Sequence, residues 1–346
     1  MIIFLLSALI IVLLAINILG ATLSGPRYSG SKSDHFNGVR FINIDGVEAK
    51  GPLPVLKWLI TRKRGRWEEN KDIPYGPKPE TRVYEGVKIT FVNHSTFLIQ
   101  MNGLNILTDP VWSERASPFS FAGPKRMRPP GVDFNDLPPI DIIFLSHNHY
   151  DHLDLPTLRA LVRLHQPRIF TPLGVKDFLC KEKIDVTKDM DWWDEHELHQ
   201  RLKIICIPAQ HFSGRGTTDR DGTLWCGYLI VRPEGNVYFA GDTGYNSRIF
   251  KDVGNRFAPI RISLLPIGAY KPVWFMSPIH CSPEQAVQIH LDLQSKTSIA
   301  THFGTFPLAD DAQDEPLKDL TAACENKAIA PGDFIALNEG QGRLFL

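Results

Sequence analysis

The spacing of apolar and polar residues divides the chain into three regions. The segment 1–23 is almost continuously apolar, whereas 24–80 is rich in glycine, proline and charge. From 81 to 346, short runs with the two-residue period of strands alternate with runs that have a helical period. The pattern therefore predicts a hydrophobic N-terminal segment, a linker with an N-terminal extension, and one large domain.

Within 81–346 the pattern predicts strands separated by helices. Residues 87–92 alternate as a strand, and residues 96–100 and 105–108 form a pair that turns at Asn102-Gly103, a preferred hairpin sequence. Further strand-like runs are 140–145, 202–207, 225–231, 236–240 and 262–265, and helical runs are 155–165, 282–293 and 316–325. Ser282 followed by Pro283 is typical of a helix start. This mixture predicts a layered α/β fold.

The N-terminal segment predicts a membrane anchor. A helix over residues 2–19, apolar except at Ser7 and Asn17, would be roughly 27 Å long, close to the hydrocarbon thickness of a bilayer. A cleaved signal peptide is the alternative, but no Lys or Arg precedes the run. We therefore expect a membrane-associated protein with a single-pass anchor over 1–23. Positive charges after the helix favour a cytoplasmic body, with a secreted body as the rival.

A second membrane-related signal lies in the extension. The amphipathic stretch 53–60 runs into the basic cluster 62–67, which ends in a tryptophan. Apolar residues beside basic ones are typical of segments that lie on an anionic bilayer. A solvated basic turn explains the pattern equally well.

Composition and charge exclude several classes of protein. The chain has 38 Lys+Arg and 38 Asp+Glu, and this balance argues against a broad nucleic-acid surface, so we expect no nucleic-acid partner. Five cysteines with no C-x-x-C pair indicate neither a disulfide framework nor a structural zinc knuckle. No nucleotide-binding glycine motif and no G-x-S-x-G nucleophile elbow occurs.

The strongest chemical signal follows the apolar run 140–145. His147, His149, Asp151 and His152 stand within six residues, directly after this predicted strand. Imidazole nitrogens and carboxylate oxygens are ligands that zinc prefers. A short loop cannot surround one ion with all four groups, so two neighbouring metals are the simpler solution. The competing interpretation, a polar loop whose histidines only form hydrogen bonds, fits this dense pattern poorly.

Three more candidate ligands stand at predicted strand ends. His211, Asp242 and His302 each follow an apolar run. Loops at the ends of a rigid sheet commonly carry the chemistry of an enzyme. By contrast, we expect His165, His196, His199 and His290 at the surface.

Several motifs make the chain similar to the metallo-β-lactamase superfamily, and within it to the branch of phospholipases D that hydrolyse N-acyl-phosphatidylethanolamine. The resemblance covers about residues 52–346. The motifs are Leu145-Ser146-His147-Asn148-His149-Tyr150-Asp151-His152-Leu153-Asp154, Phe239-Ala240-Gly241-Asp242-Thr243-Gly244-Tyr245, Pro266-Ile267-Gly268-Ala269-Tyr270, His302-Phe303-Gly304-Thr305-Phe306 and Thr108-Asp109-Pro110.

The resemblance implies an αββα four-layer sandwich that forms a single hydrolase domain over 81–346. It also implies a dinuclear centre with two Zn2+, in which His147, His149 and His211 hold one ion. Asp151, His152 and His302 would then hold the other, and Asp242 would bridge. His280 is implied at the active site as a hydrogen-bond donor or proton source, so the implied catalytic residues are His280, Asp242 and Asp151. His94 is expected to have a supporting or structural role.

The implied reaction is the cleavage of N-acyl-phosphatidylethanolamine, a membrane phospholipid, to N-acylethanolamine and phosphatidic acid by a hydroxide that bridges the metals. A homodimer is implied as well. Two other hypotheses stay open. One is the same centre acting on a lactone or another phosphoester, and the other is a membrane-anchored binding protein without catalysis.

Overall fold

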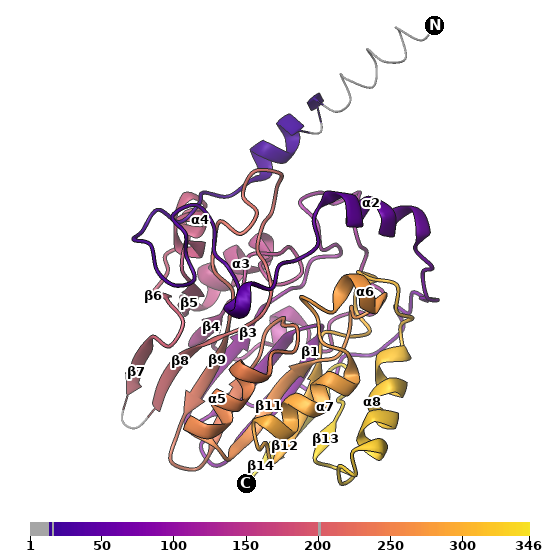
Figure 1. The fold of residues 1–346 in the computed structure, drawn as a ribbon. Coiled ribbons are helices and arrows are strands. Elements are labelled where there is room, and N and C mark those ends of the chain that lie inside the picture. Colours follow the sequence, from indigo (N-terminus) through magenta and orange to yellow (C-terminus); the bar gives the residue numbers. More distant parts are fainter. Residues whose placement is uncertain (1–13, 16, 200–201) are drawn as a thin grey trace, which may run out of the picture.

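The computed structural model describes residues 14–15, 17–199 and 202–346, which form two packed β-sheets flanked by helices (Figure 1). The strands are β1 (Val87–Asn93), β2 (Thr96–Met101), β3 (Leu104–Thr108), β4 (Ile142–Phe144), β5 (Arg168–Pro172), β6 (Lys188–Met190), β7 (Glu195–His199), β8 (Leu202–Pro208), β9 (Cys226–Val231), β10 (Asn236–Phe239), β11 (Ile260–Pro266), β12 (Thr297–Thr301), β13 (Phe334–Ile335) and β14 (Gly342–Phe345). The helices are η1 (Ile44–Gly46), α2 (Pro52–Thr61), η2 (Phe134–Asp136), α3 (Leu155–His165), α4 (Val175–Lys181), α5 (Ser247–Phe257), α6 (Val273–Met276), α7 (Pro283–Asp292) and α8 (Glu315–Asn326).

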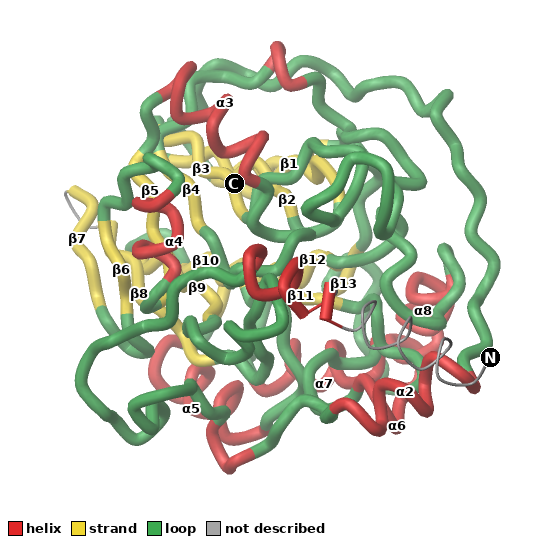
Figure 2. The backbone as a smooth tube through the Cα atoms, turned by 90° about the horizontal axis from the view of Figure 1, so that it is seen from above, coloured by secondary structure: helices red, strands yellow, loops and turns green. Residues whose placement is uncertain are grey.

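Each sheet has seven strands, in the orders β14-β1-β2-β3-β4-β5-β6 and β13-β12-β11-β10-β9-β8-β7. Each combines an antiparallel half with a parallel half, and the parallel strands run from β3 to β6 and from β10 to β13. Helices α3 and α4 cover the outer face of the first sheet, and α5, α7 and α8 cover that of the second (Figure 2). The expected αββα sandwich is therefore the observed architecture.

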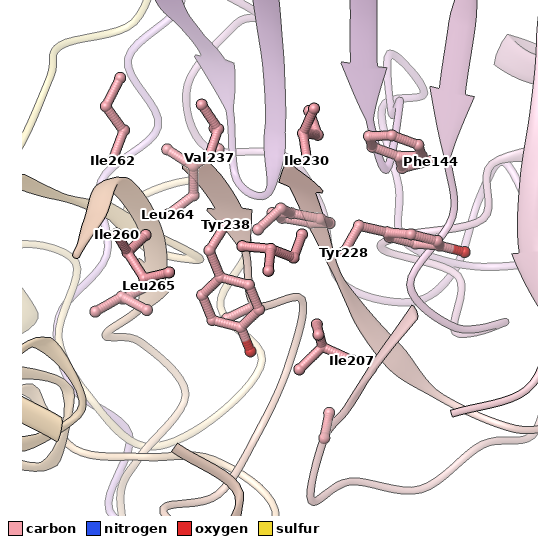
Figure 3. Packing of buried hydrophobic residues seen from close by; sticks show 14 of the residues in the cluster. Phe144, Ile207, Tyr228, Ile230, Val237, Tyr238, Ile260, Ile262, Leu264 and Leu265 are labelled. Carbon is pink, nitrogen blue, oxygen red and sulfur yellow. The ribbon is translucent and has the colours of Figure 1, made fainter. Parts of the chain in front are cut away.

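The inner faces of the two sheets form the largest hydrophobic core. Phe144 of β4 stacks on Tyr228 of β9 with ring centroids 4.6 Å apart, which joins the sheets across the middle layer (Figure 3). Val237, Ile262 and their neighbours continue this packing along the second sheet. Apolar residues on both sides of these strands explain why their sequences read as unbroken apolar runs.

The local signals read from the sequence agree with the structure. Asn102 and Gly103 both have positive φ, 48° and 71°, as the tight turn between β2 and β3 requires. Ser282 caps α7 through a capping box with Gln285, and Pro283 occupies its first turn. The prediction of His290 at the surface is wrong, because it is buried on α7 with Nδ1 2.9 Å from the Ser298 hydroxyl.

The N-terminal extension packs against the domain. Phe36 and Phe41 are fully buried members of the main core, and Tyr28 packs against both rings. Farther along, Trp58 of α2 stacks on Phe275 of α6 at 4.9 Å. Residues 24–80 thus cover one side of the sandwich, although their composition is that of a linker.

The predicted transmembrane helix, and with it the single-pass membrane localisation, is wrong for the described part of the chain. No helix among the described residues is long and apolar enough to cross a membrane. The end of the apolar segment instead contacts the domain: Thr217 N donates to Gly20 O at 3.1 Å, and Gly25 N donates to Asp219 at 2.8 Å. Residues 1–13 and 16 of the predicted anchor lie outside the described residues.

Candidate metal centre

The candidate ligands gather where strands of both sheets end. The loop after the buried strand β4 carries His147, His149, Asp151 and His152. The other sheet contributes His211 after β8, Asp242 after β10 and His302 after β12. Since these strands share the core, their loops meet at one edge of the sandwich. The structure therefore brings together all seven residues that the sequence singled out.

The first cluster consists of His147, His149 and His211. His147 Nε2 lies 2.9 Å and His211 Nε2 lies 3.3 Å from His149 Nδ1, and the ligand atoms of all three fall within 4.8 Å of one another. The ring of His211 is oriented by its Nδ1, which donates to Ile279 O at 2.8 Å. Three imidazole nitrogens that point at one spot form the donor set of a zinc-type site.

The second cluster contains Asp151, His152 and His302. Asp151 Oδ2 lies 3.3 Å from His152 Nε2 and 3.4 Å from His302 Nε2. Asp242 stands between the clusters, because its Oδ2 is 3.2 Å from His152 Nε2, 3.1 Å from His302 Nε2 and 3.8 Å from His211 Nε2. A single carboxylate within reach of both groups is the arrangement that a bridging ligand needs.

Burial and neighbouring charges divide the histidines into two kinds. Burial and the nearby imidazoles lower the pKa of His149 to about 3, and burial lowers that of His211 to about 4, so both rings are neutral at neutral pH. Burial alone would also lower the pKa of His302, but Asp242 and Asp151 raise it to about 9. The same carboxylates, with Asp109, raise the pKa of His152 well above its ordinary value.

Buried polar atoms without partners indicate what the centre is built for. His152 Nε2, His302 Nε2 and Asp242 Oδ1 are buried and meet no hydrogen-bond geometry, although both nitrogens lie within 3.2 Å of Asp242 Oδ2. Buried polar groups normally find partners, because leaving one unpaired costs about 1–3 kcal/mol. Nitrogen and carboxylate donors aimed at a shared space fit divalent metal ions, and this donor set suits zinc.

Two residues contribute more to the centre than the sequence predicted. His94 Nε2 lies 3.1 Å from Asp151 Oδ2, and its ring is 4.0 Å from that of His302, so it belongs to the second cluster. Asp109, noted only as part of a family motif, accepts from His152 Nδ1 at 2.7 Å and from Ser146 N at 2.7 Å. His94 and Asp109 have positive φ angles, 46° and 34°, which place them in turns. Nothing in the sequence indicated this backbone conformation.

His280 lies at the edge of the same centre. Its Nδ1 is 3.9 Å from Asp242 Oδ2, and its ring is 5.1 Å from that of His211. Burial lowers the pKa of His280 well below its ordinary value, and the neighbouring His211 and His302 lower it further despite Asp242. The neutral ring can donate a hydrogen bond but does not carry a surplus proton at neutral pH.

Comparison with known proteins identifies the family. The model of the beta-lactamase superfamily domain matches residues 104–303, more than half of the chain. The chain belongs to the metallo-β-lactamase superfamily. Among relatives in this superfamily, N-acyl-phosphatidylethanolamine-hydrolyzing phospholipase D 1 of Caenorhabditis elegans is 36% identical over 270 residues, covering 74% of this chain and 75% of the relative. An uncharacterized protein of Mycobacterium tuberculosis is 35% identical over 324 residues, covering 90% and 85%.

Comparison with a solved structure supports the fold. Igni18, described as a metallo hydrolase from Ignicoccus hospitalis, is 21% identical, with a TM-score of 0.57 over 75% of this chain and 98% of its own. At this identity the likeness concerns architecture alone. The family model, the sequence relatives and the His/Asp cluster make this chain a metallo-hydrolase of the metallo-β-lactamase superfamily, with a centre able to bind divalent metal ions.

Proposed function

We propose that the protein is a two-zinc phosphodiesterase that cleaves N-acyl-phosphatidylethanolamine to N-acylethanolamine and phosphatidic acid. The observation that carries the proposal is the pair of clusters with Asp242 between them. Relatives named as phospholipases D of this lipid in a nematode and in yeast support the choice of substrate.

Each group of ligands has a defined role in this proposal. His147, His149 and His211 would hold one ion, and Asp151, His152 and His302 would hold the other, with Asp242 shared. When bound, two such ions lower the pKa of water and stabilise the charge that develops on a phosphate. Asp109 and Ile279 O keep the imidazoles of His152 and His211 in one orientation, because each accepts from the nitrogen that faces away from the centre.

His280 completes the centre as a neutral donor. Its buried Nδ1 makes no hydrogen bond and lies 3.9 Å from Asp242 Oδ2, so a ring N–H at this position would be available to a phosphate oxygen. Of the two roles implied by the resemblance, its lowered pKa favours hydrogen-bond donation over the supply of a proton from an imidazolium.

An exposed apolar surface next to the centre favours a lipid over a soluble substrate. We call it the α2–α6 surface; its side chains are between 44% and 79% exposed, and they are Leu53, Leu56, Ile60, Val273 and Trp274. Helices α2 and α6 lie side by side (Figure 1, Figure 2). The segment after α6 leads directly to the centre, since His280 N donates to Met276 O at 2.9 Å.

Charge at this surface points to an anionic lipid. Lys57 Nζ lies 5.0 Å from the centre of the Trp274 ring, and Lys63 and Arg64 follow α2 as exposed cations. Exposed apolar patches with basic neighbours are the chemistry of peripheral membrane binding. The α2–α6 surface would hold the enzyme on the bilayer while the centre receives a headgroup.

The test is a product analysis with the detergent-purified, zinc-loaded protein. Vesicles containing N-acyl-phosphatidylethanolamine, a soluble phosphodiester and a lactone are offered in parallel, and the products are identified by mass spectrometry. We expect phosphatidic acid and N-acylethanolamine, lost in Asp242→Asn. Turnover of the lactone or the soluble diester alone would reject the lipid assignment.

The surface is tested by co-sedimentation with vesicles of phosphatidylcholine and phosphatidylserine. We expect the double substitution Leu56→Asp with Ile60→Asp to reduce vesicle binding at least about tenfold, because it removes two apolar side chains that would be buried in the bilayer. The control is Leu164→Asp on α3, an equally exposed leucine on the far side of the sandwich. Equal loss in the control would show that the α2–α6 surface has no special role.

A further inference from the structure

An asparagine of the N-terminal extension reaches the candidate metal centre. Asn43 lies just before η1, outside the matched superfamily domain, and its side chain is almost fully buried. Its Nδ2 donates to His211 O at 2.8 Å, and its Oδ1 accepts from His211 N at 3.0 Å. One amide group therefore pairs with both backbone polar groups of a candidate ligand that is distant in sequence.

The remaining hydrogen bonds of Asn43 fix the amide itself. Nδ2 also donates to Val47 O at 2.8 Å, and Oδ1 also accepts from Trp225 Nε1 at 2.9 Å. All four contacts require an oxygen on one side and an NH2 on the other, so only an amide of this length satisfies them. The contacts determine the orientation of Asn43 and, through it, the position of the His211 backbone.

The other end of His211 is held as well. Its Nδ1 donates to Ile279 O, which leaves Nε2 to face His149 and Asp242. With the backbone fixed by Asn43 and the ring fixed by Ile279, the imidazole has little freedom to leave the first cluster. Rigid support of this kind is what a metal site needs to bind tightly.

A neighbouring contact links the same piece of the extension to the loop that carries Asp242. Asn246 Nδ2 donates to Gln210 Oε1 at 3.0 Å and to Asp45 Oδ2 at 3.3 Å. Residues 43–45 thus touch the loops that position His211 and Asp242, one ligand of the first cluster and the shared carboxylate.

We propose that Asn43 is a positioning residue for His211, so that the N-terminal extension completes the first metal site. The inference rests on the proposed assignment of His147, His149 and His211 to one ion. The extension has other attachments to the domain besides Asn43. Tyr28 N donates to Gly222 O, Phe41 N donates to Asp221 O, and both aromatic rings pack at the core.

The experiment compares full-length Asn43→Asp and Asn43→Ala with wild type. Asp keeps the size of Asn but turns an oxygen toward the carbonyls of Val47 and His211, whereas Ala removes all four hydrogen bonds. The control is Asn37→Ala, which alters an exposed turn of the same extension whose Oδ1 accepts from Val39 N and Arg40 N. Each protein is stripped of metal and titrated with Co2+, then with Zn2+, while the visible absorption spectrum is recorded.

We expect both Asn43 variants to bind one of two ions about 10- to 100-fold more weakly, with an altered cobalt spectrum, and to bind the other ion as wild type does. Asn37→Ala should match wild type. Wild-type affinity and spectrum in both variants would overturn the inference. Equally weakened binding of both ions, together with protease cleavage of the extension, would also overturn the inference. Asn43 would then only anchor the extension to the domain. If the wild-type protein bound no Co2+ or Zn2+, the proposed function itself would fail.

Discussion

Replacement of Asp109 by asparagine tests the hydrogen bond that supports His152 without changing His152 itself. The carboxylate is fully buried and accepts from Ser146 N at 2.7 Å, from Ser146 Oγ at 2.6 Å and from His152 Nδ1 at 2.7 Å. An asparagine has the same shape, but its NH2 must face at least one of these donors in either orientation. The variant therefore loses at least one charge-assisted hydrogen bond and leaves a donor unpaired.

A hydrogen bond to a charged group contributes about 1.5–3 kcal/mol. If most of this is lost from the metal-bound state, zinc affinity falls by about 10- to 100-fold. The assay is a competition with a fluorescent zinc chelator. The control is Asp133→Asn, because the Asp133 side chain accepts from Asn135 N and Nδ2 beside η2, away from the centre. An Asp109→Asn protein that binds zinc within about twofold of wild type would refute the reasoning.

Two further predictions concern the fold around the centre. For the metal-free protein we expect the melting temperature to peak near pH 6.5. The lowered pKa values of His149 and His211 make the folded state more stable as the pH rises toward 6.5. The raised pKa of His302 stabilises the folded state fully below pH 6.5, and this contribution is lost as the pH rises toward its folded value of about 9. A melting temperature that still rises between pH 7 and 9 would contradict these charge states. Phe144→Ala removes a fully buried ring that stacks on Tyr228, so urea denaturation should show a loss of about 3–5 kcal/mol, and a loss below about 1 kcal/mol would contradict the packing described.

The elements that the sequence predicted are those with strong local signals. The turn at Asn102-Gly103 and the cap at Ser282 depend only on neighbouring residues, so they could be recognised directly. Helix α5 was not predicted, and it carries a buried glycine, Gly254, in its interior. A Cβ atom at this position would lie 2.1 Å from Asp292 O. The absence of a side chain at Gly254 therefore permits the close approach of α5 to α7.

The seven candidate ligands could be picked out because they stand in a dense motif or directly after apolar strands. His94 and Asn43 could not be assigned in this way, because their importance comes from contacts with residues far along the chain. For the N-terminal segment, the sequence predicted a feature that the described part of the chain does not show. Hydropathy alone predicted a membrane span, but it carries no information on contacts such as that of Gly20 with Thr217.

The central claim is a dinuclear centre shared through Asp242, and X-ray diffraction from crystals of the zinc-loaded protein, with data collected above and below the zinc absorption edge, tests it most directly. The account predicts two anomalous peaks, one among His147, His149 and His211 and the other among Asp151, His152 and His302, with Asp242 in contact with both. A single peak, or peaks away from these side chains, would contradict it.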